Sequence, residues 1–117
     1  MVDAAGGQAK QLTDTRTPEF KAREWLQPQI VQVPSKHGAG TIWGKYYAPA
    51  TLEPGRKYPI VMFVHGAGYL QNVSARYPNY CREQMFHNLL VDQGYIVLDL
   101  DYRASEGYGR DWRTAIY

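Results

Sequence analysis

Apolar and polar positions along the chain alternate in short blocks that predict four strands and one long helix. Residues 29–33 alternate apolar with polar positions, residues 41–47 resume the β-rich pattern, and with the turn between them they predict an antiparallel hairpin. Residues 60–64 form a continuous apolar run, and residues 95–100 form a second one that is interrupted only by Asp99. Runs of this kind predict strands buried on both faces, as in a parallel sheet.

A helix is predicted between the last two strands, over residues 80–93. Asn79 is a candidate N-cap and Gly94 a C-terminal stop. The apolar face at helical spacing consists of Met85, Phe86, Leu89 and Leu90. A strand, a helix and a strand in this order predict a parallel crossover.

The two ends of the chain carry weaker patterns. Residues 9–13 read as a short strand after a turn, and Pro18 breaks any regular element in the polar stretch that follows. Residues 1–23 are therefore predicted as a linker or the end of a preceding unit, and 24–117 as one domain. Residues 110–117 predict the start of a helix that the chain does not finish.

Composition narrows the class of protein. The 117 residues are 44% hydrophobic and 21% charged, which favours a folded domain over disorder. A net charge of +2, spread over scattered Lys and Arg, argues against nucleic acid as a partner. We find no apolar run of membrane-spanning length and no hydrophobic signal core, so export is not indicated. The single cysteine, Cys81, leaves the redox compartment open. Three histidines and Cys81 show no metal spacing, so we expect no metal and no cofactor.

The run 60–64 ends in His65, Gly66, Ala67 and Gly68. Backbone N–H groups on such a turn can hold a developing negative charge on oxygen, and those of Gly66 and Ala67 are the candidates. The alternative is a plain tight turn. His65 could be a catalytic base, but no serine elbow exists for it to activate, so we favour a buried histidine that orients the loop.

A second group of polar residues begins near the end of the last strand and continues into the loop after it. Asp99, Asp101 and Arg103 could be an acid cluster, but hydrogen bonds and ion pairs that fix the loop are favoured, since Arg pairs bidentately with carboxylates. Glu106 and Tyr108 either line a substrate pocket or face solvent.

Residues 58–68 and 94–109 together resemble the start of the catalytic domain in the prolyl oligopeptidase family of serine peptidases. Asp101, Arg103 and Ser105 fit the family's Asp-x-Arg-Gly-Ser loop, while Ala104 replaces its glycine. The resemblance implies an α/β fold: the first half of an α/β-hydrolase sheet, with an antiparallel hairpin and then strand-helix-strand. Residues 24–117 would be the N-terminal half of this catalytic domain, and 1–23 a linker or the end of a β-propeller blade.

By this resemblance the full-length protein hydrolyses peptide bonds through an acyl-enzyme. The chain has no Gly-x-Ser-x-Gly, and the family's triad follows the matched region, so we expect the chain alone to be inactive. An esterase or lipase on the same fold and a non-catalytic binding module remain alternatives.

The resemblance also predicts partners. They are a peptide substrate and the remainder of the catalytic domain, and a homo-oligomer could cover the open edge of the strand 60–64. We expect the side chains left facing water to be Val61, Phe63, Ile96 and Leu98.

Overall fold

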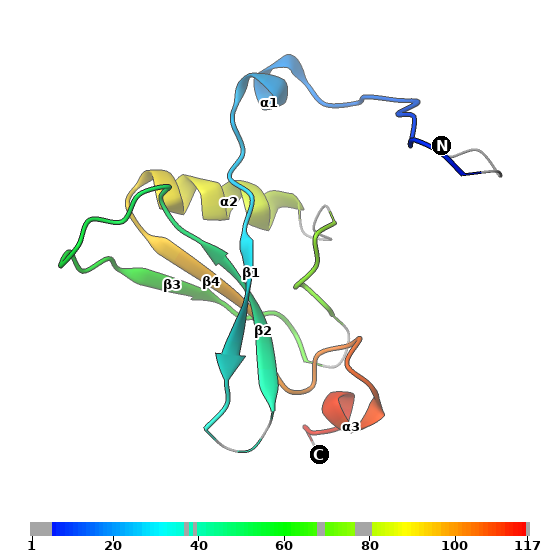
Figure 1. The fold of residues 1–117 in the computed structure, drawn as a ribbon, viewed down its shortest axis with the longest axis vertical. Helices are drawn as coiled ribbons and strands as arrows, with labels where there is room; N and C mark the ends of the chain where they lie inside the picture. Colours follow the sequence, from blue (N-terminus) through cyan, green and yellow to red (C-terminus); the bar gives the residue numbers. More distant parts are fainter. Residues whose placement is uncertain (1–5, 37, 39, 68–69, 77–80, 117) are drawn as a thin grey trace.

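The computed structural model describes residues 6–36, 38, 40–67, 70–76 and 81–116. Within these residues the fold is one mixed four-stranded sheet with three helices (Figure 1). In chain order the elements are α1 (Pro18–Ala22), β1 (Gln29–Pro34), β2 (Thr41–Tyr47), β3 (Ile60–Phe63), α2 (Cys81–Asp92), β4 (Ile96–Asp101) and α3 (Arg110–Arg113).

The strand order across the sheet is β1-β2-β4-β3. The predicted hairpin is confirmed, because β1 and β2 pair antiparallel with Gln29 opposite Tyr46. The predicted crossover is also confirmed, since β3 and β4 pair in parallel with Ile60 opposite Ile96. β2 joins the two halves by pairing antiparallel with β4, and Gly44 allows this close approach because a Cβ there would lie 2.6 Å from Leu100 Cδ2.

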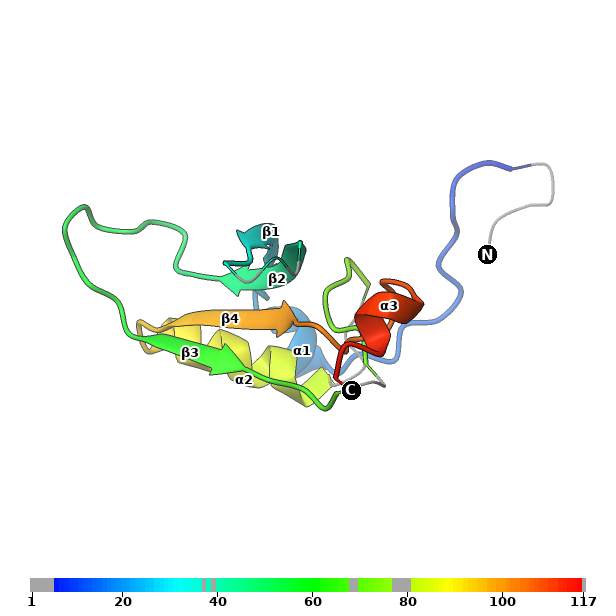
Figure 2. The ribbon, with the colours of Figure 1, turned by 90° about the horizontal axis from the view of Figure 1, so that it is seen from below.

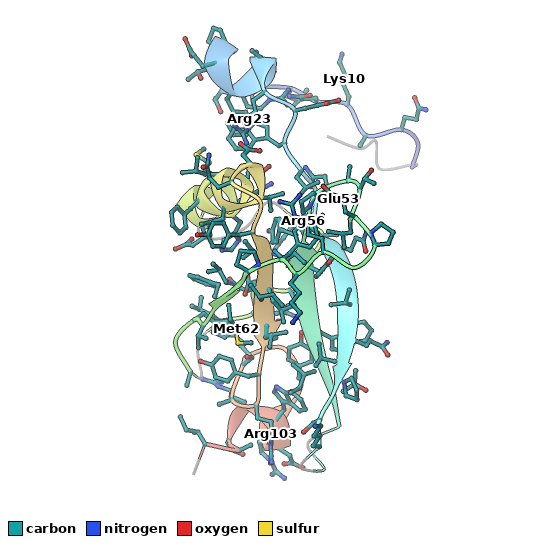
Figure 3. The ribbon with its side chains drawn as sticks, turned by 90° about the vertical axis from the view of Figure 1, so that its left-hand side faces the viewer. Lys10, Arg23, Glu53, Arg56, Met62 and Arg103 are labelled. Carbon is teal, nitrogen blue, oxygen red and sulfur yellow. The ribbon has the colours of Figure 1, made fainter. Side chains whose placement is uncertain are left out.

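β3 lies at the edge of the described sheet, and the prediction that both of its faces are buried was wrong. Figure 2 shows that α2 covers only one face of the strands β3 and β4. On the other side Ile60 and Met62, the latter labelled in Figure 3, are 63% and 55% exposed. The face covered by α2 carries Val61 and Phe63, which are half-buried.

The expected set of water-facing side chains therefore needs correction. Ile96 is buried and Leu98 half-buried. Leu98 lies between Met62 of β3 and Tyr46 of β2 in the sheet. The most exposed apolar side chains of this region are instead Ile60, Met62 and Val64.

Helix α2 forms where predicted, but its orientation about its own axis is the reverse of the prediction. Gly94 ends it with φ +85°, donating its N–H to the Val91 carbonyl at 2.9 Å, while Asn79 lies outside the described residues. Of the predicted apolar face, Met85, Phe86 and Leu89 are exposed and only Leu90 is half-buried. The buried face is polar and consists of Gln84, His87 and Asn88.

Asn88 explains part of this reversal. Its Oδ1 accepts the backbone N–H of Leu26 at 2.8 Å, and its Nδ2 donates to the Gln84 carbonyl at 3.0 Å. A buried amide with such partners ties the chain ahead of β1 to α2, and the hydrogen bonds offset its desolvation.

The N-terminal part differs from the prediction in two ways. Residues 9–13 form no strand. Pro18 begins α1 instead of breaking it, because the N–H that proline lacks has no helical partner in the first turn anyway. Thr17 caps this turn by accepting the Phe20 N–H at 3.2 Å, and the Phe20 and Trp25 rings stack at 4.7 Å. At the other end α3 begins at Arg110 as predicted, but it ends at Arg113.

Candidate active site

The glycine loop and the polar loop after β4 lie next to each other because β3 and β4 run in parallel. Phe63 pairs with Asp99 at the carboxyl ends of the two strands. The chain therefore brings His65 and Asp101 together from positions 36 residues apart. Open α/β sheets bind ligands at this edge.

Asp101 is the centre of the site, with a carboxylate that is fully buried. Its Oδ1 accepts the Asn72 N–H at 2.8 Å and lies 3.1 Å from His65 Nε2. Its Oδ2 accepts the Val73 N–H at 3.1 Å and the Tyr108 hydroxyl at 2.8 Å. These four contacts match the roughly four lone-pair positions of a carboxylate, so one side chain ties the connection between β3 and α2 to the loop between β4 and α3.

His65 has both ring nitrogens engaged within the protein. Nδ1 lies 2.8 Å from the Gly66 carbonyl oxygen, which can only accept, so Nδ1 donates. Nε2 lies 3.1 Å from Asp101 Oδ1 and 3.3 Å from Ser105 Oγ. With its side chain fully buried, the imidazole offers no nitrogen to a substrate, which supports a loop-orienting role over that of a base.

Ser105, His65 and Asp101 have the residue types of a serine-hydrolase triad but not its geometry. In a working triad the carboxylate and the serine contact opposite nitrogens of the imidazole. Here both contact Nε2, and Ser105 is fully buried. The cluster is therefore a structural hydrogen-bond network.

Gly66 and Ala67 carry the two N–H groups predicted from the sequence as candidate oxyanion donors. No described residue accepts a hydrogen bond from either N–H. The Gly66 carbonyl is bound by His65 Nδ1, and the His65 carbonyl accepts the hydroxyl of Tyr102. Gly66 is exposed, and a Cβ placed on it would meet no atom within 4 Å, so there is space beside the loop.

Asp99 and Arg103 do not form the ion pair that the sequence suggested. The Asp99 carboxylate, buried beneath α2, accepts the Asn72 amide at 3.2 and 3.3 Å, and burial raises its pKa. Burial also lowers the pKa of the neighbouring Lys45. Arg103 is exposed, and Figure 3 shows it beside α3; among the described residues it pairs with neither carboxylate.

Glu106 and Tyr108 lie in the same loop but differ in surroundings. Glu106 is exposed, and its backbone N–H donates to the Leu70 carbonyl at 3.0 Å. Tyr108 is half-buried, and burial together with its hydrogen bond to Asp101 raises the pKa of its phenol. Its hydroxyl is thus committed to Asp101, and only its ring can face a ligand.

Comparisons with known proteins fit this arrangement. The BD-FAE family model matches residues 46–113, which include the glycine loop and the Asp101 loop. The chain belongs to the BD-FAE family. Human and mouse dipeptidyl peptidase 8 are 34% identical over 82 residues, covering 70% of this chain and 9% of theirs. The uncharacterized peptidase YuxL of Bacillus subtilis is 23% identical over 111 residues, covering 95% of this chain and 16% of its own.

Two solved structures share the fold of this BD-FAE chain. A dipeptidyl aminopeptidase IV from Bacteroides ovatus, described as putative, matches with TM-score 0.64 and 20% identity over 78% of this chain and 13% of its own. The acylaminoacyl peptidase of Pyrococcus horikoshii matches with TM-score 0.64 and 27% identity over 88% and 15%. The predicted α/β-hydrolase architecture and the resemblance to the prolyl oligopeptidase family are confirmed.

Two other features bear on function. Across the described residues, no helix is both long and apolar enough to cross a membrane. In the same part of the chain no three His, Cys, Asp or Glu side chains are grouped to hold a metal ion.

Proposed function

We propose that this chain supplies the oxyanion-binding side of a serine peptidase catalytic domain. The backbone N–H groups of Gly66 and Ala67 would bind the carbonyl oxygen of the scissile peptide bond as it becomes negatively charged. The chain has no Gly-x-Ser-x-Gly, so the nucleophile, acid and base would come from residues outside these 117. His65 holds the loop in place and takes no proton from the nucleophile.

The observation that carries the proposal is the orientation of the loop after β3. Both carbonyls of the turn are bound inside the protein, by Tyr102 and by the His65 ring. No described residue accepts a hydrogen bond from either N–H group, and a Cβ placed on Gly66 would meet no atom within 4 Å. Such fixed dipoles stabilise an oxyanion without reorganising, and removing one donor costs roughly 10²–10³ in kcat.

Peptide substrates are the substrate class we propose, since the relatives are named as peptidases. Glu106 and Tyr108 lie in the loop after β4, which Asp101 links through His65 to the glycine loop. We propose that they border the substrate pocket, with the exposed Glu106 carboxylate available to a basic or N-terminal amino group of the peptide.

The test combines sequence and activity. Sequencing the gene beyond Tyr117 should show a Gly-x-Ser-x-Gly in frame. The full-length gene product should cleave the amide bond of acyl-peptide substrates. Hydrolysis of p-nitrophenyl esters without any cleavage of peptide amides would favour an esterase, and a stop codon with no elbow would favour a binding module.

Within that protein, Ala67→Pro removes one candidate donor and should lower kcat by roughly a hundredfold. Ala50→Pro, in the exposed loop between β2 and β3, is the matched control and should leave kcat unchanged. Circular dichroism must show both variants folded. An unchanged kcat in folded Ala67→Pro would exclude the Ala67 N–H and leave that of Gly66.

A further inference from the structure

Tyr102, the residue after β4, reaches across to the end of β3. Its hydroxyl donates to the carbonyl oxygen of His65, and its ring stacks on the His65 imidazole with centroids 4.9 Å apart and planes at 26°. Neither composition nor spacing singled out this tyrosine as a site residue.

The backbone of Tyr102 is itself fixed. Its carbonyl accepts the indole N–H of Trp112 at 3.1 Å and the N–H of Ser105 at 3.0 Å. The backbone that carries the Tyr102 side chain is therefore fixed, and the hydroxyl at the other end of the side chain binds the glycine loop. A hydrogen bond from such an anchored donor restrains the group that accepts it.

Because a peptide unit is planar, the hydrogen bond to the His65 carbonyl also restrains the N–H of Gly66, a candidate oxyanion donor. In a planar trans peptide unit, the carbonyl of one residue and the N–H of the next point in opposite directions. The His65 carbonyl and the Gly66 N–H belong to one such unit, and the Gly66 carbonyl and the Ala67 N–H to the next. Tyr102 thus controls the direction of the Gly66 N–H, and His65 Nδ1 controls that of Ala67.

We propose that Tyr102 is a positioning residue that aims the Gly66 N–H at the oxyanion by holding the His65 carbonyl. This inference rests on the proposed function for its catalytic consequence, but the restraint on the peptide unit stands on the structure alone. Without the hydroxyl, the 65–66 peptide unit loses the hydrogen bond that fixes the direction of its carbonyl, and a donor misplaced by about 1 Å can cost up to roughly a hundredfold in rate.

The kinetic test uses Tyr102→Phe in the full-length gene product. We expect kcat to fall about tenfold or more with KM unchanged, because the donor acts on the transition state. Tyr58→Phe is the matched control: the Tyr58 hydroxyl accepts the Glu53 N–H at 3.0 Å in an exposed loop, so its loss should leave kcat unchanged. Replacing Tyr102 by p-aminophenylalanine restores a donor at the same place and should recover most of the lost rate.

A spectroscopic test does not depend on activity. Labelling histidine carbonyls with ¹³C and glycine amides with ¹⁵N selects His–Gly peptide units, and this chain has two, at residues 37–38 and 65–66. In Tyr102→Phe the carbonyl and amide signals of the 65–66 unit should move, while those of 37–38 serve as the internal control and stay in place.

The outcomes separate the two proposals. A folded Tyr102→Phe variant whose 65–66 signals match wild type overturns the positioning role outright. Shifted signals with unchanged kcat in an active enzyme overturn its catalytic consequence. An inactive wild-type protein refutes the proposed function instead, and the labelled peptide unit still decides whether Tyr102 restrains the loop.

Discussion

His87 makes the stability of this fold depend on pH, and the direction follows from its surroundings. The imidazole is 2% exposed beneath α2, with its ring edge-on to Tyr47 at 5.0 Å and to Phe63 at 5.4 Å. Its Nδ1 has no hydrogen-bond partner in the described structure. Burial, assisted by the charge of Lys45, lowers the pKa of His87 from 6.5 to about 4.

The lowered pKa means that the unfolded chain takes up the proton first on acidification. The contribution of neutral His87 to stability is therefore complete above about pH 6.5 and is lost as the pH falls towards 4. At 1.36 kcal/mol per pKa unit, going from pH 8 to pH 5 removes about 2 kcal/mol. Small domains are stable by only about 5–15 kcal/mol, so the effect is measurable.

Urea unfolding of the wild type and of His87→Phe at pH 8 and pH 5 measures this contribution. Phenylalanine keeps the edge contacts with Tyr47 and Phe63 but does not titrate. We expect the wild type to lose about 2 kcal/mol more than the variant between the two pH values. Asp99, whose pKa is raised by burial, acts in the opposite direction, but it is present in both proteins and cancels. Equal losses in the two proteins would refute the reasoning.

Two further predictions concern backbone strain and exposed apolar surface. Ala104 is buried with φ +85°, so in the full-length gene product Ala104→Gly should raise the free energy of unfolding of the catalytic domain by about 1 kcal/mol in urea titrations; an unchanged or lower midpoint would show that the backbone there is not strained. The 117-residue chain should bind ANS and should not react with a fluorophosphonate probe, since it exposes Ile60 and Met62 and lacks a serine elbow. Stoichiometric labelling of one serine would contradict the second expectation, and a sharp thermal transition without ANS binding the first.

Strands and helix boundaries could be predicted from the sequence because they depend on local patterns. The hairpin, the two parallel strands and the Gly94 stop all follow from neighbouring residues. The face that α2 buries could not be predicted, because it depends on Asn88 binding the backbone of Leu26, 62 residues away. A hydrophobic pattern finds a helix, but a buried amide with distant partners can reverse its orientation.

The candidate site also contains features that the sequence could predict and features that it could not. The glycine loop was visible as a motif, and the strained Ala104 marks a position where the resembled family has glycine. The network around Asp101 was not visible, because its donors include the backbone N–H groups of Asn72 and Val73, which any residue supplies. The one available signal was the set of polar residues directly after β4, where the strand ends of a parallel sheet meet.

Several apolar residues that the sequence assigned to a core are exposed to water in the structure, and this difference bears on the function. β3 has the composition of a strand buried on both faces, yet Ile60 and Met62 are exposed. On α2, Phe86 and Leu89 are exposed in the same way. The chain spans 9–16% of the curated relatives that it matches. One of these apolar surfaces lies on β3 and the other on α2. Both are expected in a segment of a larger hydrolase domain, because each would pack against further strands or helices. The disagreement between pattern and exposure thus supports the same proposal as the missing serine elbow, from packing instead of chemistry.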